Sequence, residues 1–510
     1  MSNKSNNNER IAKNTLFLYF RMFLVMAVSL ITVRVLLNTL GIKDYGTYNA
    51  IAGFISSLVF VSSALSAASQ RFFSYYLGSG NKILLKESFS MIFFTYLIVV
   101  VAIIIIAESI GVWFVFNKMC LPAGRENAVM WVFQMALLTS CFSFLSNPFQ
   151  ALIISHEEMN IYAVLSIVEV VLKLLIILLL PIILIDKLIL YSILHFMVFA
   201  GIASVYFIIC YRKYEEAHIQ LKWNIKMFKS IFSYTSWSMF GSISGMLNTQ
   251  GINILLNIFY GPIANAAYAI SAQVSAAVNQ FSSSFYTAVR PSLIKSYASE
   301  DFKYMTTLFY MSNKVLFMLM FILIVPIFLV TRPLLSLWLS QVDLYMIEFV
   351  RLALIYTFIL CLSNPITTII QAANKVKLYH GLVDSFTLLS LPLIYLLFKI
   401  NFHPIYAYVT TITIFILAHA IRLIILSKTI DFSIIQYLKK IILPIIFTIV
   451  IVTTLSYAVC LIPINNELCI IFIRGGIGFI SATVVGFYCV FTIEERVMFL
   501  KLINKKFLNR

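Results

Sequence analysis

Charged side chains are scarce in this 510-residue sequence: they make up 11% of it, against about 25% in an average soluble domain. Hydrophobic residues make up 61%, and the mean hydropathy is +0.96. The apolar runs do not show the weak two-residue alternation of an outer-membrane barrel. These features exclude a soluble globular protein and predict an all-α, polytopic membrane protein.

The sequence also lacks the motifs of several other classes of protein. Its seven cysteines are scattered, mostly inside apolar runs and without a CxxC pair, so we expect small buried hydrophobes and neither a disulfide framework nor a metal site. No Walker sequence is present, which excludes ATP as the direct energy source and leaves no cofactor to expect. The polar, basic N-terminus leads into an apolar run longer than a signal peptide's, without a cleavage site, and predicts a retained first helix.

Positive charge is distributed unevenly among the expected loops. The apolar runs predict about fourteen membrane-spanning helices, near residues 14–38, 46–68, 88–110, 127–154, 161–185, 188–211, 230–259, 264–288, 310–331, 345–372, 378–398, 404–427, 437–462 and 468–492. With the N-terminus in the cytoplasm, cytoplasmic segments receive 24 Lys and Arg, and external loops receive six. This asymmetry follows the positive-inside rule. The net charge of +17 therefore reflects topology and requires no nucleic-acid partner.

The stretch 237–290 carries more polar side chains than a simple membrane anchor would. Two largely apolar runs are joined by a Tyr-Gly-Pro turn, and each is long enough to cross a bilayer. Gln250, Asn253 and Asn257 fall within about 60° of one helical face, and Asn279 ends a polar stripe on the next helix. An amide in lipid costs several kcal/mol unless it is hydrogen-bonded. We therefore expect these side chains to face protein or a wet intramembrane cavity.

The two halves of the chain share short matches at two nearly equal separations. At the first separation, Leu36-Leu37-Asn38 matches Leu255-Leu256-Asn257 and Arg71 matches Arg290. At the second, slightly shorter one, Ser146-Asn147-Pro148 matches Ser363-Asn364-Pro365 and Tyr162 matches Tyr379. An internal duplication explains such paired matches better than chance does. We predict two parallel six-helix repeats, because an even number of helices brings both halves in from the same side.

Four charged side chains of the first half, on two of the expected membrane spans, are candidate site residues. Arg21 and Arg34 lie on the first helix, where a charge costs at least about 2.5–3.5 kcal/mol. We predict that Arg21 faces a cavity, whereas Arg34 either faces it or extends to the interface. Glu169 and Lys173 are spaced i, i+4 on the fifth helix. They form either a neutralised structural pair or a substrate-contacting site.

A further charged pair is expected in the second half. Glu348 and Arg351 lie at i, i+3 near the outer end of the tenth helix, and their spacing predicts an interfacial ion pair.

Three motifs resemble one transporter family over nearly the whole chain. The run RVLLNTLGIKDYG (34–46) resembles the signature at the first hairpin of polysaccharide (O-antigen, Wzx-type) flippases, although Leu-Asn-Thr interrupts its usual spacing. NTQGINILLNIFYGPIANAAYAISAQV (248–274) resembles their seventh and eighth helices, and WLSQVDLYMIEFVRL (338–352) resembles their entry to the tenth. These flippases belong to the multidrug/oligosaccharidyl-lipid/polysaccharide (MOP) exporter superfamily, alongside the MATE drug exporters.

The resemblance implies a MATE-like fold and a lipid-linked cargo. We expect an N-terminal lobe at 1–213, a cytoplasmic amphipathic link at 214–229, a C-terminal lobe at 230–430, and two additional helices with a basic amphipathic tail at 431–510. The implied function is to flip a polyprenyl-pyrophosphate-linked oligosaccharide across the bacterial plasma (inner) membrane by alternating access, with both termini cytoplasmic. Arg21, Arg34 and Lys173 would attract the pyrophosphate, and Gln250, Asn253, Asn257 and Asn279 would hydrogen-bond the sugars. Implied partners are membrane lipid, a polysaccharide polymerase and glycosyltransferases.

Two alternatives belong to other functional classes. A MATE-type drug exporter shares the fold, but a site for cationic drugs would require buried carboxylates, and Glu169 is the one well-buried acid that the sequence predicts. A membrane glycosyltransferase or polymerase would be an enzyme. It would need acidic motifs or a large external domain, whereas the longest external loop expected here has fewer than twenty residues. The sequence therefore favours a transporter without catalytic residues.

Overall fold

The structure is a computed structural model, and it describes residues 2–58, 61–118, 124–183, 185–221, 223–339, 342–460 and 466–497. Throughout these ranges the regular secondary structure is helical. The chain separates into two compact units, Arg10–Met239 and Phe240–Arg510, with Met1–Glu9 assigned to the second. The expected all-α fold is confirmed.

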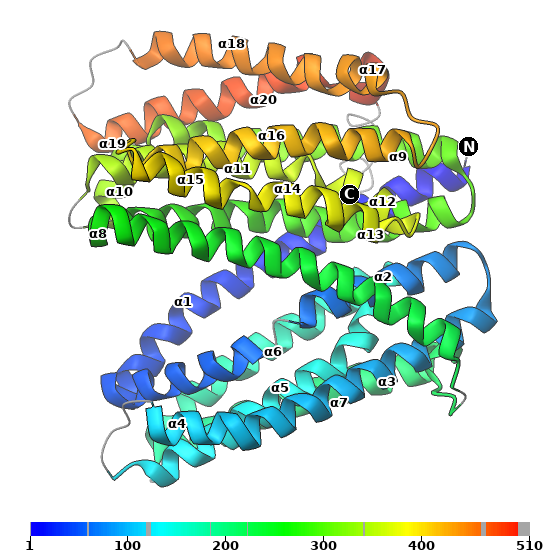
Figure 1. Cartoon of the computed structure of the whole chain (residues 1–510), viewed down its shortest axis with the longest axis vertical. Helices are drawn as coiled ribbons and strands as arrows, with labels where there is room; N and C mark the ends of the chain where they lie inside the picture. The colour runs from blue at the N-terminus through cyan, green and yellow to red at the C-terminus, as the bar shows by residue number, and fades with distance from the viewer. Residues whose placement is uncertain are drawn as a thin grey trace, which may run out of the picture. The chain divides into compact units, whose positions relative to one another are not determined.

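The first unit is a bundle of long helices around an aromatic core. Its helices are α1 (Ser2–Leu58), α2 (Ser62–Gly78), α3 (Lys82–Ile106), α4 (Val112–Lys118), α5 (Glu126–Ser155), α6 (Met159–Leu179) and α7 (Lys187–Lys213). A π turn, Ala107–Gly111, makes α3 and α4 continuous. Helix α5 packs against α2, α3, α6 and α7 (Figure 1). Phe73, Phe89, Tyr96, Phe133 and Phe144 are fully buried between α2, α3 and α5, and this apolar burial stabilises the unit.

The second unit begins within α8 (Ile225–Ala298) and continues to the end of the described chain. Its other helices are α9 (Phe302–Leu329), α10 (Thr331–Trp338), α11 (Leu344–Cys361), α12 (Asn364–Ala372), α13 (Val376–Tyr379), α14 (Ser385–Leu388), α15 (Ser390–Lys399), α16 (Tyr406–Ser427), α17 (Ile434–Tyr437), α18 (Leu443–Cys460), α19 (Glu467–Ile470) and α20 (Gly476–Val490). Single π turns connect α13 to α14, α17 to α18 and α19 to α20. The two helices outside the repeat, α18 and α20, pack against each other, and α20 packs against α9 (Figure 1).

Eleven helices among the described residues are long and apolar enough to cross a membrane. They coincide with eleven of the expected spans. Of the other three expected spans, 46–68 falls in the end of α1 and the start of α2. The spans 230–259 and 264–288, which carry the polar amides, both fall in α8. The chain is therefore a multi-pass membrane protein, and the full count of fourteen remains a prediction.

Backbone conformation supports the internal duplication. Six of the eight described residues with positive φ form three pairs that relate the two halves: Gly41 with Gly261, Gly80 with Glu300, and Glu157 with Asn374. The first two pairs have the same separation along the chain, and that of the third is slightly shorter, as in the sequence matches. Asn81 and Asp301, which directly follow the second pair, each accept a hydrogen bond from a backbone N–H in the first turn of α3 or α9 and so cap that helix. Both halves therefore place the same turns and caps in the same order.

The first turn of each repeat is reduced to one residue. Gly41 in α1 (φ 78°, ψ 165°) and Gly261 in α8 (φ 76°, ψ −166°) have non-helical backbone angles, whereas the helix continues on either side. This region of backbone space is open essentially to glycine alone. The short turns expected at these places are single-glycine breaks within long helices.

Two segments differ from the expected outline or lie beyond it. Within the expected amphipathic link 214–229, residues 218–221 and 223–224 are not helical, and the link is fixed to α3 by hydrogen bonds from Gln220 N to Ser90 Oγ (2.9 Å) and from Asn224 Nδ2 to Glu87 Oε2 (3.1 Å). Hydrogen bonds to α3 thus hold this part of the link, and its position along the cytoplasmic surface remains a prediction. The expected amphipathic tail from 498 onward lies outside the described residues.

Candidate cation-lined transport site

The first unit holds a close ion pair on α6. Lys173 Nζ lies 2.6 Å from Glu169 Oε1, one helical turn apart, and each side chain is 22% exposed. The ammonium also lies 3.9 Å from the ring centroid of Phe199 on α7, which is a cation–π distance. The pair thus exists as the i, i+4 spacing predicted, and an aromatic ring holds its positive end.

Arg21 of α1 approaches the same face of α6. Its guanidinium carbon lies 4.7 Å from the ring centroid of Tyr162, and its Nε is buried without a hydrogen-bond partner. A buried donor that lacks a partner costs about 1–3 kcal/mol. Arg21 is therefore a candidate for contact with a ligand, because its Nε has no partner among the described residues.

One cavity connects these groups. It has a volume of about 290 Å³ and is lined by Arg21, Val25, Thr32, Ser166, Glu169, Val170 and Lys173. With both basic groups and the carboxylate charged, its lining carries a net charge of +1. Of the predicted site residues in this half, the structure brings together Arg21, Glu169 and Lys173. The side chain of Arg34 lies outside the described residues.

Two hydroxyl residues of this cavity, Thr32 and Ser166, were missed by the sequence analysis. Ser166 and Glu169 are spaced i, i+3 and therefore lie on the same helical face. The Ser166 hydroxyl donates to the Tyr162 carbonyl at 2.8 Å. Helical spacing from the charged pair would have identified Ser166, whereas Thr32 follows from tertiary contact alone.

The predicted amides of the second unit occupy different environments. Asn253 is half-buried, and its Oδ1 and backbone carbonyl accept from Asn265 Nδ2 at 2.8 and 2.9 Å, across the break at Gly261. Gln250 and Asn257 are exposed in this unit, and Asn279 is half-buried. Asn253 therefore braces the turn through Asn265, and the contribution of the other three to a cavity remains a prediction.

Asn248 is a buried amide that the sequence analysis missed. Its Nδ2 donates to Ser390 Oγ at 2.8 Å and to the Thr387 carbonyl at 3.1 Å, which ties α8 to the start of α15. Ser390 corresponds to Lys173 at the separation that relates Tyr162 to Tyr379. Ser390 thus makes a neutral hydrogen bond at the position where Lys173 of the first repeat makes an ion pair.

The duplicated tyrosines both contact a guanidinium, but from different helices. Tyr162 contacts Arg21 of α1, whereas Tyr379 OH accepts from Arg422 Nε of α16 at 3.1 Å. Arg422 is buried and was not singled out from the sequence. Because it does not share a helix or a repeat position with Arg21, only the folded structure could reveal the parallel.

A second charged cluster lies at the Gly41 end of the first unit. Arg125 forms ion pairs with Asp44, which belongs to the Asp-Tyr-Gly motif, and with Asp186, which caps α7 by accepting from the N–H groups of Leu188 and Ile189. Partial burial would raise the pKa of the Asp186 carboxyl, but hydrogen bonds from Arg125 and the two backbone groups, with the charge of Arg125, hold it below the ordinary 3.8. The motif aspartate thus joins the first hairpin to α5 and α7.

The arrangement of helices defines the class of protein. Solved structures with this fold include a MATE transporter in the bent conformation (TM-score 0.71, 12% identity, 84% of this chain and 98% of that chain). They also include an outward-facing multidrug resistance MATE family transporter of the MOP superfamily (TM-score 0.69, 12% identity, 81% and 95%). A third is a MOP superfamily transporter from Pyrococcus furiosus (TM-score 0.68, 12% identity, 84% and 97%). The chain therefore has the MATE fold.

The sequence itself identifies the family. Residues 11–297 match the family model described as polysaccharide biosynthesis protein, and the chain belongs to this family. A comparison with curated proteins finds no match. The chain thus combines membership of the polysaccharide biosynthesis protein family with the MATE fold, and its resemblance to the flippases predicted both.

Proposed function

We propose that this transporter flips a polyprenyl-pyrophosphate-linked oligosaccharide from the cytoplasmic to the outer leaflet of the bacterial plasma membrane. The observation that carries the proposal is the cavity of the first unit, where Arg21 offers a buried, unpartnered Nε beside Lys173. Membership of a polysaccharide biosynthesis family supports a glycan cargo.

The chemistry of the cavity favours an anion. A pyrophosphate presents several oxygen acceptors, and a guanidinium matches phosphate geometry with more than one N–H group. In a low-dielectric cavity, attraction between opposite charges is several times stronger than in water. The hydroxyls of Thr32 and Ser166 line the same space, where they can contact phosphate or sugar oxygens.

Transport then follows from alternating access. Two repeats of the same helical order can rock so that a central site opens to each side in turn. A head group held by charge–charge and hydrogen-bond contacts crosses the membrane without making or breaking a bond, so none of the site residues needs a catalytic role. We propose that Arg34, Gln250, Asn257 and Asn279 contribute to the same path.

A drug exporter is the second candidate, because the solved structures with this fold include MATE transporters. For the Pyrococcus furiosus transporter, the reverse polarity of its binding pocket suggests a different function. In this chain, the net positive charge of the cavity lining disfavours binding of a cationic drug. Within the cavity of the first unit, Glu169 is the sole carboxylate, and Lys173 already pairs with it.

The test uses surface glycan display in cells that depend on this chain. Arg21→Ala is expected to lower display by roughly tenfold or more, since a charge-assisted contact of about 1.5–3 kcal/mol is lost. Arg34→Ala is expected to act in the same direction. Membrane insertion of these variants, measured by detecting a C-terminal tag in the membrane fraction, is expected to remain normal.

Arg212→Ala is the matched control, because Arg212 is an exposed arginine at the end of α7, outside the cavity. Normal display by an Arg21→Ala, Lys173→Ala double variant would overturn the proposal. If the double variant lowered resistance to cationic drugs and left glycan display unchanged, the result would support a drug exporter. Genes for glycosyltransferases and a polymerase beside this one would favour the glycan cargo and those partners.

A further inference from the structure

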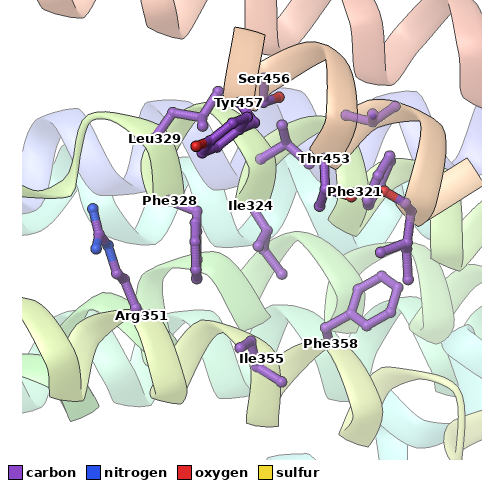
Figure 2. Close-up of a pocket in the computed structure, with 13 residues that line it drawn as sticks. Phe321, Ile324, Phe328, Leu329, Arg351, Ile355, Phe358, Thr453, Ser456 and Tyr457 are labelled. Carbon is purple, nitrogen blue, oxygen red and sulfur yellow. Dashed lines mark hydrogen bonds between the residues drawn. The ribbon is translucent and has the colours of Figure 1, made fainter. Parts of the chain in front are cut away.

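A groove on the second unit lies between α9, α11 and α18. Its volume is about 510 Å³ (Figure 2). Most of its wall is apolar and comes from all three helices: Phe321 and Ile324 of α9, Ile355 and Phe358 of α11, and Val452 of α18. A groove of this composition in a membrane-spanning unit suits a hydrocarbon chain.

The polar side chains of the groove come from two of its helices, Arg351 from α11 and Thr453, Ser456 and Tyr457 from α18. Helix α9 ends at Leu329, α11 begins at Leu344 and α18 ends at Cys460, so Phe328, Arg351 and Tyr457 all lie toward the same end of the three helices. Figure 2 shows Arg351 beside Phe328, with Ser456 and Tyr457 on α18 and Phe358 farther along the groove. The lining is therefore mostly apolar, with one cation on α11 and hydroxyl groups on α18.

Two polar atoms of residues that line the groove have no hydrogen-bond partner among the described residues. The guanidinium carbon of Arg351 lies 5.2 Å from the Phe328 ring centroid, and its Nε is buried without a hydrogen-bond partner. Ser456, which is 6% exposed, has a buried Oγ that also lacks a partner. The groove is thus lined by two helices, α11 and α18, that each carry a polar atom without a partner among the described residues.

The charge of Arg351 is not neutralised within the described residues. Glu348, one turn earlier on α11, was expected to pair with it, but this ion pair does not form, and Glu348 Oε2 has no hydrogen-bond partner. The i, i+3 expectation is thus wrong here, because the guanidinium instead lies over the Phe328 ring of α9. A half-buried arginine without a carboxylate partner among the described residues favours an anion from outside the chain.

We propose that this groove binds one anionic phospholipid of the outer leaflet. Its phosphodiester contacts Arg351, and one acyl chain lies along Phe321, Ile355 and Phe358. The single cation selects the anionic head group, and the apolar wall takes the chain from the surrounding membrane. The outer leaflet follows from the expected topology, in which α9 ends and α11 begins outside. The proposal uses no residue of the transport cavity.

The experiment measures lipid binding to the purified full-length protein in detergent by native mass spectrometry. Dioleoyl phosphatidylglycerol is the anionic probe, and dioleoyl phosphatidylcholine is the zwitterionic comparison. We expect one retained phosphatidylglycerol in the wild type and roughly tenfold weaker retention in Arg351→Gln, the effect of losing one charge-assisted contact. Arg332→Gln, which removes an exposed arginine of α10 outside the groove, is expected to bind as the wild type does.

Two further variants keep the test decisive if Arg351→Gln does not fold. Arg351→Lys keeps the charge and is expected to keep binding, whereas Ile355→Trp leaves the arginine intact and is expected to displace the lipid by filling the groove. Equal retention of both lipids, or retention unchanged by Arg351→Gln and by Ile355→Trp, would overturn the assignment. Displacement of phosphatidylglycerol by a stoichiometric amount of polyprenyl phosphate would overturn it too, and would assign the groove to the carrier lipid.

Discussion

Lys173 has two possible partners for its charge, the resident Glu169 and an entering anion. In the described structure Glu169 holds the ammonium at 2.6 Å, while Arg21 keeps its Nε unpartnered. An entering pyrophosphate would therefore take Arg21 without competition but would have to displace Glu169 from Lys173. In the proposed transport cycle, the Glu169 carboxylate would therefore weaken binding of the pyrophosphate and ease its release.

Removal of this competitor should tighten binding. Glu169→Gln is expected to raise the affinity for a polyprenyl-pyrophosphate lipid by roughly fivefold, because about 1 kcal/mol of ion pairing no longer opposes it. Lys173→Gln is expected to lower the affinity. Binding of the lipid to purified protein in nanodiscs measures both changes. Equal affinities for the wild type and Glu169→Gln would show that the pair is a structural contact only.

At the scale of elements, the ends of helices carry the most specific polar contacts. Asp186 caps α7 and pairs with Arg125, which in turn holds Asp44 of the first hairpin. One side chain thereby supports two functions, a helix cap and a link between loops. Substitutions can separate these two functions because asparagine caps a helix about as well as aspartate does.

Asp186→Asn is expected to keep the cap and lose the charge, whereas Asp186→Ala loses both and costs about 1 kcal/mol more. The pKa of Asp186 lies below its ordinary 3.8 in the folded protein, so its ionised form stabilises the fold above that value. The stability advantage of the wild type over Asp186→Asn should be constant near neutral pH and shrink as the pH falls below 3.8. Thermal unfolding in detergent across this range measures it. An advantage that persisted at the lowest pH would exclude the carboxylate as its source.

The single-glycine breaks give a second prediction at this scale. Gly41→Ala and Gly261→Ala are each expected to destabilise the protein by about 1–3 kcal/mol, because no other residue adopts these backbone angles without strain. Space is not the cause, since a Cβ at either position would meet no neighbour within 4 Å.

Gly201→Ala is the matched control, since Gly201 lies within α7, also with open space around its Cα. There alanine should be neutral or stabilising by up to about 1 kcal/mol. Thermal unfolding of the three variants compares these effects. If the three variants changed the unfolding temperature by the same amount, backbone strain at the breaks would be excluded as the cause.

At the scale of the whole molecule, topology follows from loop charge and can be tested with cysteines. In a variant that retains only Cys469, an exposed residue of α19, a membrane-impermeant maleimide is expected to label the protein in intact cells. In a cysteine-free background, Ser299→Cys, at the exposed turn between α8 and α9, should react only after permeabilisation. The physical reason is the positive-inside rule. The reverse pattern would place the termini outside and would reverse the proposed transport direction.

Much of the architecture could be predicted because its causes are local. About twenty consecutive apolar residues dictate a spanning helix whatever surrounds them, and eleven expected spans are found among the described residues. Short matches at two separations predicted the duplication, which the paired left-handed residues support. The Glu169–Lys173 contact was also predictable, because i, i+4 spacing on a helix fixes it.

The site could be predicted only in part, because its contacts cross between helices. Thr32, Asn248, Asn265 and Arg422 escaped detection since nothing in their own sequence neighbourhoods marks them. Glu348 and Arg351 show the opposite error: their spacing allowed a pair, but Arg351 found an aromatic ring on α9. Spacing along a helix shows which side chains can reach each other, and packing against neighbouring helices determines which contacts form.

The sequence by itself determined that this chain is a helical membrane protein, built twice from one pattern, with cations where lipid would forbid them. These properties depend on hydropathy, charge and repeat spacing, which act along the chain. Only the tertiary structure decided that Arg21 meets the Glu169–Lys173 pair at one cavity, and that the charge of Arg351 is left unpaired beside an apolar groove. Such arrangements depend on which helices become neighbours, and that choice is made by packing over the whole bundle.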